Sequence, residues 1–314
     1  MRLKHAQLVA RERDMPTGHV DGYQGFLAHL KDLRDDFERS FWTLRDKRMP
    51  YDNEIIAAFD DPPPEDLAAA YDLTPEQLAD IERTVQRKYV VHFKNIRRSW
   101  ALLLQHMPEL MAEGCEPQTV LEMSTAHGAT LEVLRRKGHR AIGNDFAAFF
   151  GKDSPADTRL RDAGAVDLTG LVDKDGLNPA EGPITRWPYQ PIIESLDLDV
   201  RLFDAGNPPY PFEDRSVDSV LCFDAIEHYC HPRDWMAIIA EFTRIARRSV
   251  LVIINPLNPL NPLTDDPAYA AAHRAFQKDM RTYADRGFRC VHAGLYRHQL
   301  AVFKLMRTGA LHAV

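Results

Sequence analysis

The sequence predicts a doubly wound, mostly parallel α/β sheet, and two observations support this prediction. Apolar runs that are typical of buried strands alternate, in the second half of the chain, with amphipathic runs that are typical of helices. The first such unit, residues 119–145, contains a strand, a turn of small residues, a helix that Gly138 is placed to end, and a second strand tipped by Asp145. This combination forms the nucleotide-binding half of a doubly wound sheet.

The composition is that of an ordinary globular protein. The chain has 314 residues, of which 45% are apolar and 27% charged, and a net charge of −7 without a long basic stripe. Nucleic acid is therefore not an expected partner. The four cysteines form no C-x-x-C pair, no apolar run reaches membrane-spanning length, and the first residues lack a signal-peptide pattern. We expect a cytoplasmic protein that is not embedded in a membrane.

Residues 1–115 are predicted to form a helical N-terminal extension. Within residues 23–48, apolar side chains recur every three or four positions, which predicts an amphipathic helix with one apolar stripe. The stripe is expected to cover the core of its own subunit. A homodimer that forms through these N-terminal helices is the alternative.

A second helical region is predicted to begin at Thr74 and to close at Pro108 and Gly114. Between residues 83 and 98 it carries only basic charges, at Arg83, Arg87, Lys88, Lys94, Arg97 and Arg98. Such a run is usually a solvated face of a helix, and this is our interpretation. An anionic acceptor that rests on it is the alternative.

Residues 116–314 are predicted to hold the α/β domain, with an insertion at about residues 151–190. Residues 151–186 are rich in glycine, proline and acids, and so long an irregular stretch tends to be a lid or a binding element. We therefore expect an acceptor-specific insertion there. The aromatic pair Trp187 and Tyr189 follows it, either to line a pocket or to pin the loop.

The rest of the domain is predicted as a regular succession of strands and helices. We expect a helix at 192–196, a strand at 200–204, a strand at 219–223, a helix at 234–248, a strand at 249–254, a helix at 268–285, and two last strands at 287–292 and 299–305. The strand ends carry polar or turn-forming groups. Because parallel strands end at one edge of a sheet, these groups should meet where open α/β sheets bind ligands.

The turn after the first strand separates two classes of ligand. It reads Glu122-x-Ser124-x-Ala126-x-Gly128, with a carboxylate at the strand end followed by small residues two positions apart. A dinucleotide site needs G-x-G-x-x-G and would be repelled by this carboxylate, so a nicotinamide oxidoreductase is disfavoured. The carboxylate suits a ligand that carries an ammonium group.

This turn resembles the first motif of the class I S-adenosylmethionine-dependent methyltransferases, D/E-x-G-x-G-x-G, with two of its glycines replaced. Later family motifs follow in order, at Asp204-Ala205, Pro211-Phe212, residues 217–220, Glu227-His228 and Pro232. The likeness spans about residues 117–307. It implies a Rossmann-like methyltransferase fold with a mostly parallel seven-stranded sheet, whose last two strands form a reversed hairpin.

The resemblance also implies S-adenosylmethionine as cofactor and a set of residues that contact it. The expected contacts are to the methionine part from Glu122, Ser124, Ala126 and Gly128, to the ribose from Asp145, to the adenine from Phe146, Asp204 and Ala205, and to the sulfonium end from Phe223 and Asp224. For each of the carboxylates, capping of a helix or turn is the alternative role.

The methyl acceptor is expected to be a small molecule with a hydroxyl or an amine, whose proton a base removes. His228 is the first candidate base, because imidazole titrates near neutral pH, and Glu227 and Tyr229 complete the catalytic candidates. A structural role for His228 stays open. Weaker catalytic candidates are His127, His231 and Trp187.

Three alternatives concern the chemistry of this site. A thioether acceptor such as methionine would need no base, only aromatic faces and acids around the product sulfonium. A catalytically silent protein, which binds the cofactor or only a partner, would fit the two replaced glycines. A zinc site at His228, Cys230 and His231 is disfavoured, because neighbours on a turn seldom converge on one ion, and no metal is expected.

Overall fold

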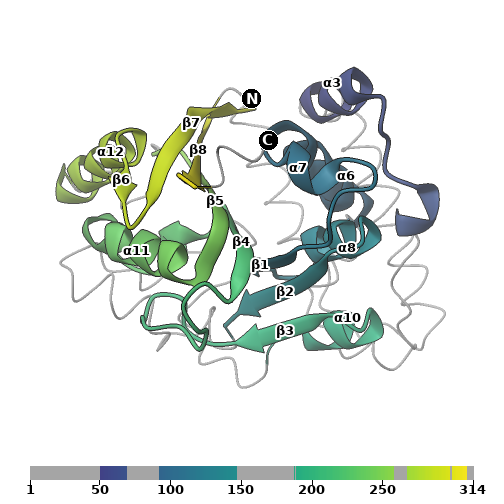
Figure 1. Ribbon diagram of the computed structural model, residues 1–314, viewed down its shortest axis with the longest axis horizontal. Helices are drawn as coiled ribbons and strands as arrows, with labels where there is room; N and C mark the ends of the chain where they lie inside the picture. Colours follow the sequence, from purple (N-terminus) through teal and green to yellow (C-terminus); the bar gives the residue numbers. More distant parts are fainter. Residues whose placement is uncertain are drawn as a thin grey trace, which may run out of the picture.

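The computed structural model describes residues 50–68, 92–146, 187, 189–257, 267–297 and 299–309 of the chain. It confirms the predicted doubly wound α/β fold, as Figure 1 shows. The predicted helix at 23–48, the helix start at Thr74 and the insertion at 151–186 lie outside these residues. In the part of the chain that the structure describes, no helix is both long and apolar enough to cross a membrane.

The described strands form one sheet in the order β3-β2-β1-β4-β5-β8-β7-β6. They are β1 (Thr119–Met123), β2 (Arg140–Asp145), β3 (Asp199–Leu202), β4 (Val217–Phe223), β5 (Ala246–Ile254), β6 (Ala284–Asp285), β7 (Phe288–Tyr296) and β8 (Leu300–Arg307). Strands β1 to β5 are parallel, and β8 runs antiparallel between β5 and β7. The reversed hairpin that closes the predicted sheet is therefore present.

The strand count differs from the predicted seven, because the described sheet has 8 strands. The additional strand is β6, which has 2 residues and pairs with the start of β7 across a turn at Arg286 and Gly287, both at positive φ. The helix predicted at 268–285 consequently ends earlier, at Arg281. The third strand is also shorter than predicted, since β3 ends at Leu202 and leaves Asp204 in the following turn.

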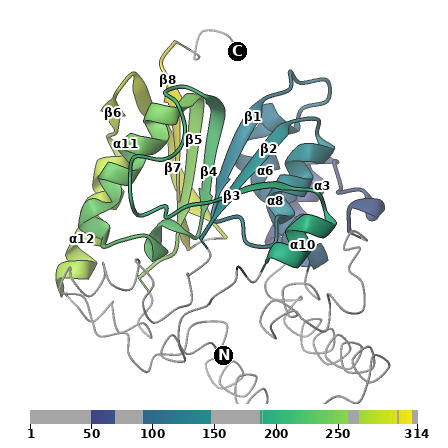
Figure 2. The same cartoon turned by 90° about the horizontal axis from the view of Figure 1, so that it is seen from below.

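Helices cover both faces of the sheet, as Figure 2 shows. They are α3 (Pro50–Phe59), α6 (His92–His106), α7 (Pro108–Met111), α8 (Ala129–Arg136), α10 (Gln190–Ser195), α11 (Trp235–Ile245) and α12 (Pro267–Arg281), with short 3-10 helices η1 (Glu65–Ala68), η3 (Ile226–His228) and η4 (Pro232–Asp234). Helices α11 and α12 lie on one face, and α3, α6 and α8 on the other.

Two apolar cores result, because successive side chains of a strand point to opposite faces. In β4, Val220 and Cys222 pack with the side chains of α11 and α12, whereas Leu221 between them packs with those of α6 and α8. Both cores are made almost entirely of buried aliphatic and aromatic groups. The sheet is therefore covered on both faces, as its mostly parallel strands require.

The end of the predicted N-terminal extension is part of this cover. Trp100 and Leu103 of α6 are buried in the same core as Val120 of β1 and Leu251 of β5. Pro108 and Gly114 were predicted to close the helical region; α6 ends at His106, but Pro108 itself begins the short helix α7, which ends at Met111, before Gly114. A proline fits the first turn of a helix, where its missing N–H needs no partner.

Candidate functional site

The carboxyl ends of the parallel strands meet at one edge of the sheet. The strand order reverses between β1 and β4, which lie side by side and connect to β2 and β5 in opposite directions. Open α/β sheets bind ligands at such a switch point, outside the carboxyl ends of the strands. The residues that follow β1, β2, β3 and β4 therefore define the candidate site.

The turn after β1 holds three residues in the left-handed region of φ, where side chains other than glycine are strained. These are Ser124 at 55°, Ala126 at 51° and Gly128 at 80°. Two of the three therefore adopt a glycine-like backbone although they carry a Cβ. A Cβ at Gly128 would also lie 2.4 Å from Leu198 Cδ1, so the Leu198 side chain would have to shift.

Glu122 lies just before this turn, and its side chain is buried. Its carboxylate accepts a hydrogen bond of 2.5 Å from Thr125 Oγ1. Burial raises the pKa of Glu122 from 4.5 to about 7, against the opposing effect of the bond from Thr125. A bound cation would lower this pKa again, so Glu122 can change its charge when a positively charged ligand enters.

Asp145 ends β2, as predicted, and its carboxylate is held by two donors. The backbone N–H of Phe146 donates to Oδ1 at 2.8 Å, and the indole Nε1 of Trp187 donates to Oδ2 at 3.0 Å. Asp145 and Trp187 are both buried. The chain thus returns to the tip of β2 directly after the predicted insertion, and Trp187 fixes the carboxylate that was predicted to accept ribose hydroxyls.

Asp204 and Ala205 lie in the turn after β3. Asp204 Oδ1 accepts a bond of 2.9 Å from the backbone N–H of Gly206, which is the turn-capping role named as its alternative. The carbonyl oxygen of Ala205 accepts a bond of 2.5 Å from the Tyr210 hydroxyl. Hydrogen bonds within residues 204–210 therefore hold the turn that was predicted to bind the edge of the adenine.

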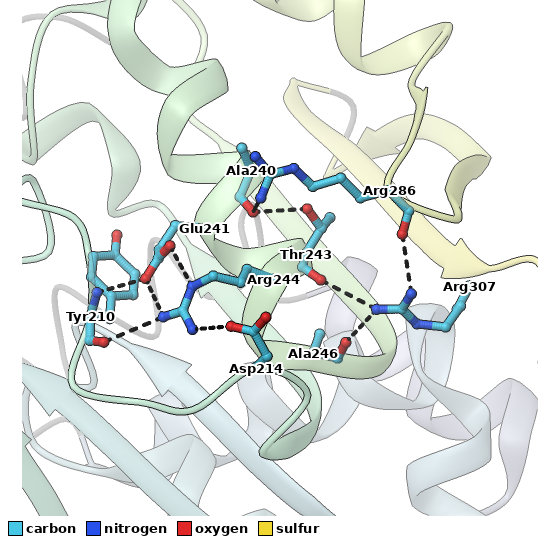
Figure 3. Close-up of polar contacts among 9 residues, drawn as sticks. All are labelled: Tyr210, Asp214, Ala240, Glu241, Thr243, Arg244, Ala246, Arg286 and Arg307. Carbon is cyan, nitrogen blue, oxygen red and sulfur yellow. Dashed lines mark hydrogen bonds and ion pairs between the residues drawn. The ribbon is translucent and has the colours of Figure 1, made fainter.

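Helix α11 anchors Tyr210 through the polar network in Figure 3. Glu241 accepts the backbone N–H of Tyr210 at 2.6 Å, and Arg244 joins Glu241 to Asp214, with 2.6 Å for each ion pair. Burial alone would raise the pKa of Glu241, but the bonds from Arg244 and Tyr210 bring it below its usual value. Glu241 therefore keeps its charge near neutral pH, and its bond from Tyr210 positions the turn after β3.

A residue of α6 enters the site at the end of β4. Asp224, at positive φ directly after Phe223, forms an ion pair between its Oδ2 and Arg98 Nη2. The interpretation of the basic run as a solvated face is wrong for Arg98, because Arg98 forms an ion pair with the residue that directly follows β4. The charge of Asp224 raises the pKa of Arg98, against the opposing effect of burial.

Two further bonds attach α6 to the first turn and to α8. Asn95 Nδ2 lies 3.0 Å from His127 Nε2, and Ser99 Oγ lies 2.9 Å from Thr130 Oγ1. With Arg98, these side chains form one polar stripe of α6, spaced three and four positions apart. The sequence analysis did not predict that α6 contacts the site, although the helical spacing of Asn95, Arg98 and Ser99 was a sequence signal for it.

The three catalytic candidates occupy different surroundings after β4. The Tyr229 hydroxyl lies 2.9 Å from Ser124 Oγ and 3.9 Å from Cys222 Sγ, and burial raises its pKa well above the usual value. Glu227 Oε1 accepts the backbone N–H of Asn255, after β5. The His228 ring is half-buried, and its backbone N–H donates to Ala225 O at 2.9 Å. The raised pKa thus disfavours Tyr229 as a base at neutral pH.

The weaker candidates also have places in the structure. His231 is buried, and its Nδ1 accepts the backbone N–H of Arg233 at 3.2 Å, at the start of η4. His127 lies in the first turn. Within the described ranges, no three side chains of histidine, cysteine, aspartate or glutamate lie together as a metal site requires.

No protein-family model matches the chain, and no curated protein matches its sequence. Solved structures that are similar to it include methyltransferases. Magnesium protoporphyrin IX methyltransferase from Synechocystis PCC 6803, with bound SAM, is 16% identical over 72% of this chain and 85% of that one, with a TM-score of 0.37. A SAM-dependent methyltransferase from Aquifex aeolicus is 15% identical over 68% and 98%, also with a TM-score of 0.37.

A third similar structure is the 1,6-didemethyltoxoflavin-N1-methyltransferase of Burkholderia thailandensis, solved with its acceptor and S-adenosylhomocysteine. It is 13% identical over 68% of this chain and 78% of that chain, with a TM-score of 0.37. At these identities and TM-scores, the likeness assigns this chain neither a cofactor nor a substrate.

Proposed function

We propose that this chain is an S-adenosylmethionine-dependent methyltransferase that acts on a small-molecule acceptor. The observation that carries the proposal is the turn after β1, which adopts positive φ at Ser124, Ala126 and Gly128. Residues other than glycine keep such a backbone only where the surrounding structure enforces it, and these sites are often functional. The three positions are those of the glycines in the family motif.

The acids around this turn support the same ligand. Three acids lie at the ends of parallel strands: Glu122 near the end of β1, Asp145 at the end of β2 and Asp224 directly after β4. The side chains of Glu122 and Asp145 are buried, and that of Asp224 is half-buried. A ligand with a sulfonium and an ammonium group gains from such carboxylates, and a vicinal diol can bond to both oxygens of Asp145. Phe146 is half-buried next to Asp145 in the sequence, where its ring can lie beside the adenine of the cofactor.

Methyl transfer from a sulfonium demands alignment, exclusion of water and, for a hydroxyl or amine, removal of a proton. In the proposed reaction the acceptor atom forms a bond to the methyl carbon as the carbon–sulfur bond breaks, and S-adenosylhomocysteine leaves. His228 takes the acceptor's proton. Tyr229 and Glu227 position this segment, the first through Ser124 and the second through Asn255.

Calorimetric titration with S-adenosylmethionine and S-adenosylhomocysteine tests the proposal. We expect binding of both, and loss of binding in Asp145→Ala. The matched control is Asp199→Ala, which removes an exposed carboxylate at the opposite end of the strands. If the wild type binds neither compound, the methyltransferase proposal is wrong and a silent interaction protein, suggested by Ser124 and Ala126 in place of glycines, replaces it.

The dependence of the rate on pH separates the two kinds of acceptor. A hydroxyl or amine acceptor predicts a rate that rises with pH through the pKa of His228, and loss of this limb in His228→Ala. Transfer to a thioether needs no base and predicts a nearly flat profile in both proteins. A flat wild-type profile would thus favour S-methylation.

A further inference from the structure

Strand β7 lies near the end of the sheet, with only the two-residue strand β6 beyond it (Figure 1). On its inner side, β7 pairs with β8 along its whole length. On its outer side, β6 pairs only with Phe288 and Arg289, and the backbone N–H of Cys290 donates to Tyr283 O at 2.9 Å. In the described part of the chain, no strand pairs with the outer side of residues 291–296. This free edge of β7 can therefore accept a further strand.

The free edge carries exposed apolar side chains. Among the described residues, four large apolar side chains are exposed, and two of them lie here, Val291 at 41% and Leu295 at 56%. Ala293 between them is exposed as well. Ala293 and Leu295 lie on the face of the sheet that α11 and α12 cover, because they pair with residues of that core on β8. A row of uncovered apolar groups thus follows the outermost long strand.

The sequence of this edge lacks the residues that usually protect one. Free edges are commonly blocked by lysine, proline or inward charges, and residues 290–296, Cys-Val-His-Ala-Gly-Leu-Tyr, contain no proline, lysine, arginine or acid. The pairing with β8 shifts register between Cys290 and His292, a bulge at the start of the edge, and is regular from His292 to Tyr296. A long, exposed and apolar edge of this kind favours pairing with another chain.

The pattern of residues 291–295 is complementary to itself. When a second copy runs antiparallel about a two-fold axis at Ala293, Val291 lies opposite the partner's Leu295, and His292 lies opposite the partner's Gly294. The two large apolar side chains then meet, and each imidazole faces a residue without a side chain. Directly opposite apolar pairs are the contacts that stabilise an antiparallel ladder. The axis at Ala293 is also the one that pairs all five of these residues.

Charge favours a second copy over a charged partner. The chain has a net charge of −7, so two copies repel each other on approach. An edge without acids or bases adds nothing to that repulsion, and it offers no charge to an acidic or basic partner. A copy of the same chain therefore fits this edge better than a partner that would be recognised by its charge.

We propose that a second copy of this chain pairs antiparallel with β7, with the two-fold axis at Ala293, so that the two sheets continue into one. The contact is isologous, as is usual for a homodimer. Strand β6 limits it at one end and the turn at Arg297, with a φ of 50°, at the other. This surface is distinct from the N-terminal helices, and the inference does not depend on the proposed function.

The arrangement leaves both candidate sites open. The two-fold axis reverses the direction of the strands, so the carboxyl ends of the parallel strands of the two copies lie at opposite edges of the combined sheet. Neither copy then covers the candidate site of the other. Binding of a cofactor or an acceptor is therefore compatible with the dimer.

Analytical ultracentrifugation of the full-length protein over a series of concentrations tests the proposal. We expect the wild type to show a monomer–dimer equilibrium. Leu295→Lys should weaken dimerisation by about tenfold or more, because the two-fold axis places each new charge in the interface twice. The matched control is Leu202→Lys, since Leu202 is 49% exposed on β3, the strand at the opposite end of the sheet. This control should dimerise like the wild type.

A disulfide cross-link tests the position of the axis. Residues directly opposite in an antiparallel pair have Cβ atoms about 4.5–5.5 Å apart, close to the distance that a disulfide spans. In a Cys290→Ser background, Ala293→Cys should therefore form a covalent dimer under mild oxidation, and a reductant should reverse it. Leu202→Cys in the same background controls for the other cysteines and should give no covalent dimer.

Weaker dimerisation of Leu295→Lys together with the cross-link at residue 293 supports the inference. If Leu295→Lys does not fold, the cross-link decides alone. A dimer that Leu295→Lys leaves intact and that does not cross-link uses another surface, which overturns the inference. A wild type that stays monomeric at every concentration also overturns it. Thermal unfolding then identifies the other occupant, because Leu295→Lys destabilises the monomer when its own chain covers β7 and leaves it unchanged when the edge serves a different protein.

Discussion

The hydroxyl oxygens of Ser124 and Tyr229 lie 2.9 Å apart and join the turn after β1 to the segment after β4. Ser124 holds a φ of 55°, which a glycine would adopt without strain. Its hydroxyl, which a glycine would lack, gives the buried Tyr229 hydroxyl a partner. Ser124 therefore combines a strained backbone with a hydrogen bond that joins the two segments.

This combination predicts a coupling between the two residues. Ser124→Gly relieves strain but removes the bond, so we expect little change in the free energy of unfolding. In a Tyr229→Phe background the bond is already absent, and the same substitution should stabilise by about 1 kcal/mol. Urea unfolding of the four proteins measures this coupling. Equal effects of Ser124→Gly in both backgrounds would show that the hydroxyl bond contributes nothing.

Ala126 carries the same strain without any hydroxyl to offset it, at a φ of 51°. We expect Ala126→Gly to raise the free energy of unfolding by about 1 kcal/mol, because glycine has no Cβ clash in the left-handed region. The control is Ala237→Gly in the exposed part of α11, where glycine should destabilise by about 1 kcal/mol. Destabilisation by both substitutions would mean that the turn is not strained at Ala126.

Much of this site could be predicted because its signals are local in the sequence. The apolar runs and small-residue turn predicted β1, α8 and β2, and Gly138, at a φ of 87°, ends the helix as predicted. Asp145 at the end of β2 and Asp224 directly after β4 lie at the predicted edge of the sheet, because each of them follows an apolar run in the sequence. The prediction missed features that depend on contacts between elements, such as the two-residue strand β6, which forms by pairing with β7.

The contribution of Arg98 shows why the rest could not be predicted. Its ion pair joins residues 126 positions apart, and nothing in the basic run distinguishes Arg98 from Arg97. Trp187 likewise reaches Asp145 from 42 positions away. Such contacts depend on where α6 and Trp187 lie against the sheet edge, and tertiary packing decides this, which a local sequence pattern does not show. The helical spacing of Asn95 and Arg98 was the one local hint.

Glu122 predicts a characteristic dependence of stability on pH. Its pKa rises from 4.5 in the unfolded chain to about 7 in the fold, so the unfolded state loses the proton first. Stability should fall between pH 4.5 and 7, by on the order of 3 kcal/mol in all. Glu122→Gln lacks this loss. Its stability relative to the wild type, measured by urea unfolding at pH 5 and pH 8, should therefore increase with pH, and a constant difference would contradict the raised pKa.

The network on α11 predicts a large loss from one arginine. Arg244→Met leaves the carboxylate of Glu241, whose side chain is 7% exposed, without its cation, and we expect a loss of about 3 kcal/mol. Arg247→Met is the control, because Arg247 pairs with Asp218 from a side chain that is 47% exposed and should contribute less than about 1 kcal/mol. Denaturant unfolding compares the two, and similar losses would argue against a special role for Glu241.

Trp187 predicts a difference between two tryptophans. Its indole donates to the charged Oδ2 of Asp145 at 3.0 Å, whereas the indole of Trp100 donates to a neutral carbonyl, that of Asp61, at 2.6 Å. Phenylalanine keeps a ring at either position but removes the donor. A bond to a charged group contributes about 1.5–3 kcal/mol, and a neutral one about 1 kcal/mol.

We therefore expect Trp187→Phe to destabilise more than Trp100→Phe, and the difference to disappear when Asp145 is replaced by asparagine. Urea unfolding of the single and double variants measures both effects. Because each comparison is between two tryptophan-to-phenylalanine changes, the loss of ring area is similar and largely cancels. If the two losses stay equal, or if the difference persists in the Asp145→Asn background, Trp187 acts by packing and does not orient the carboxylate.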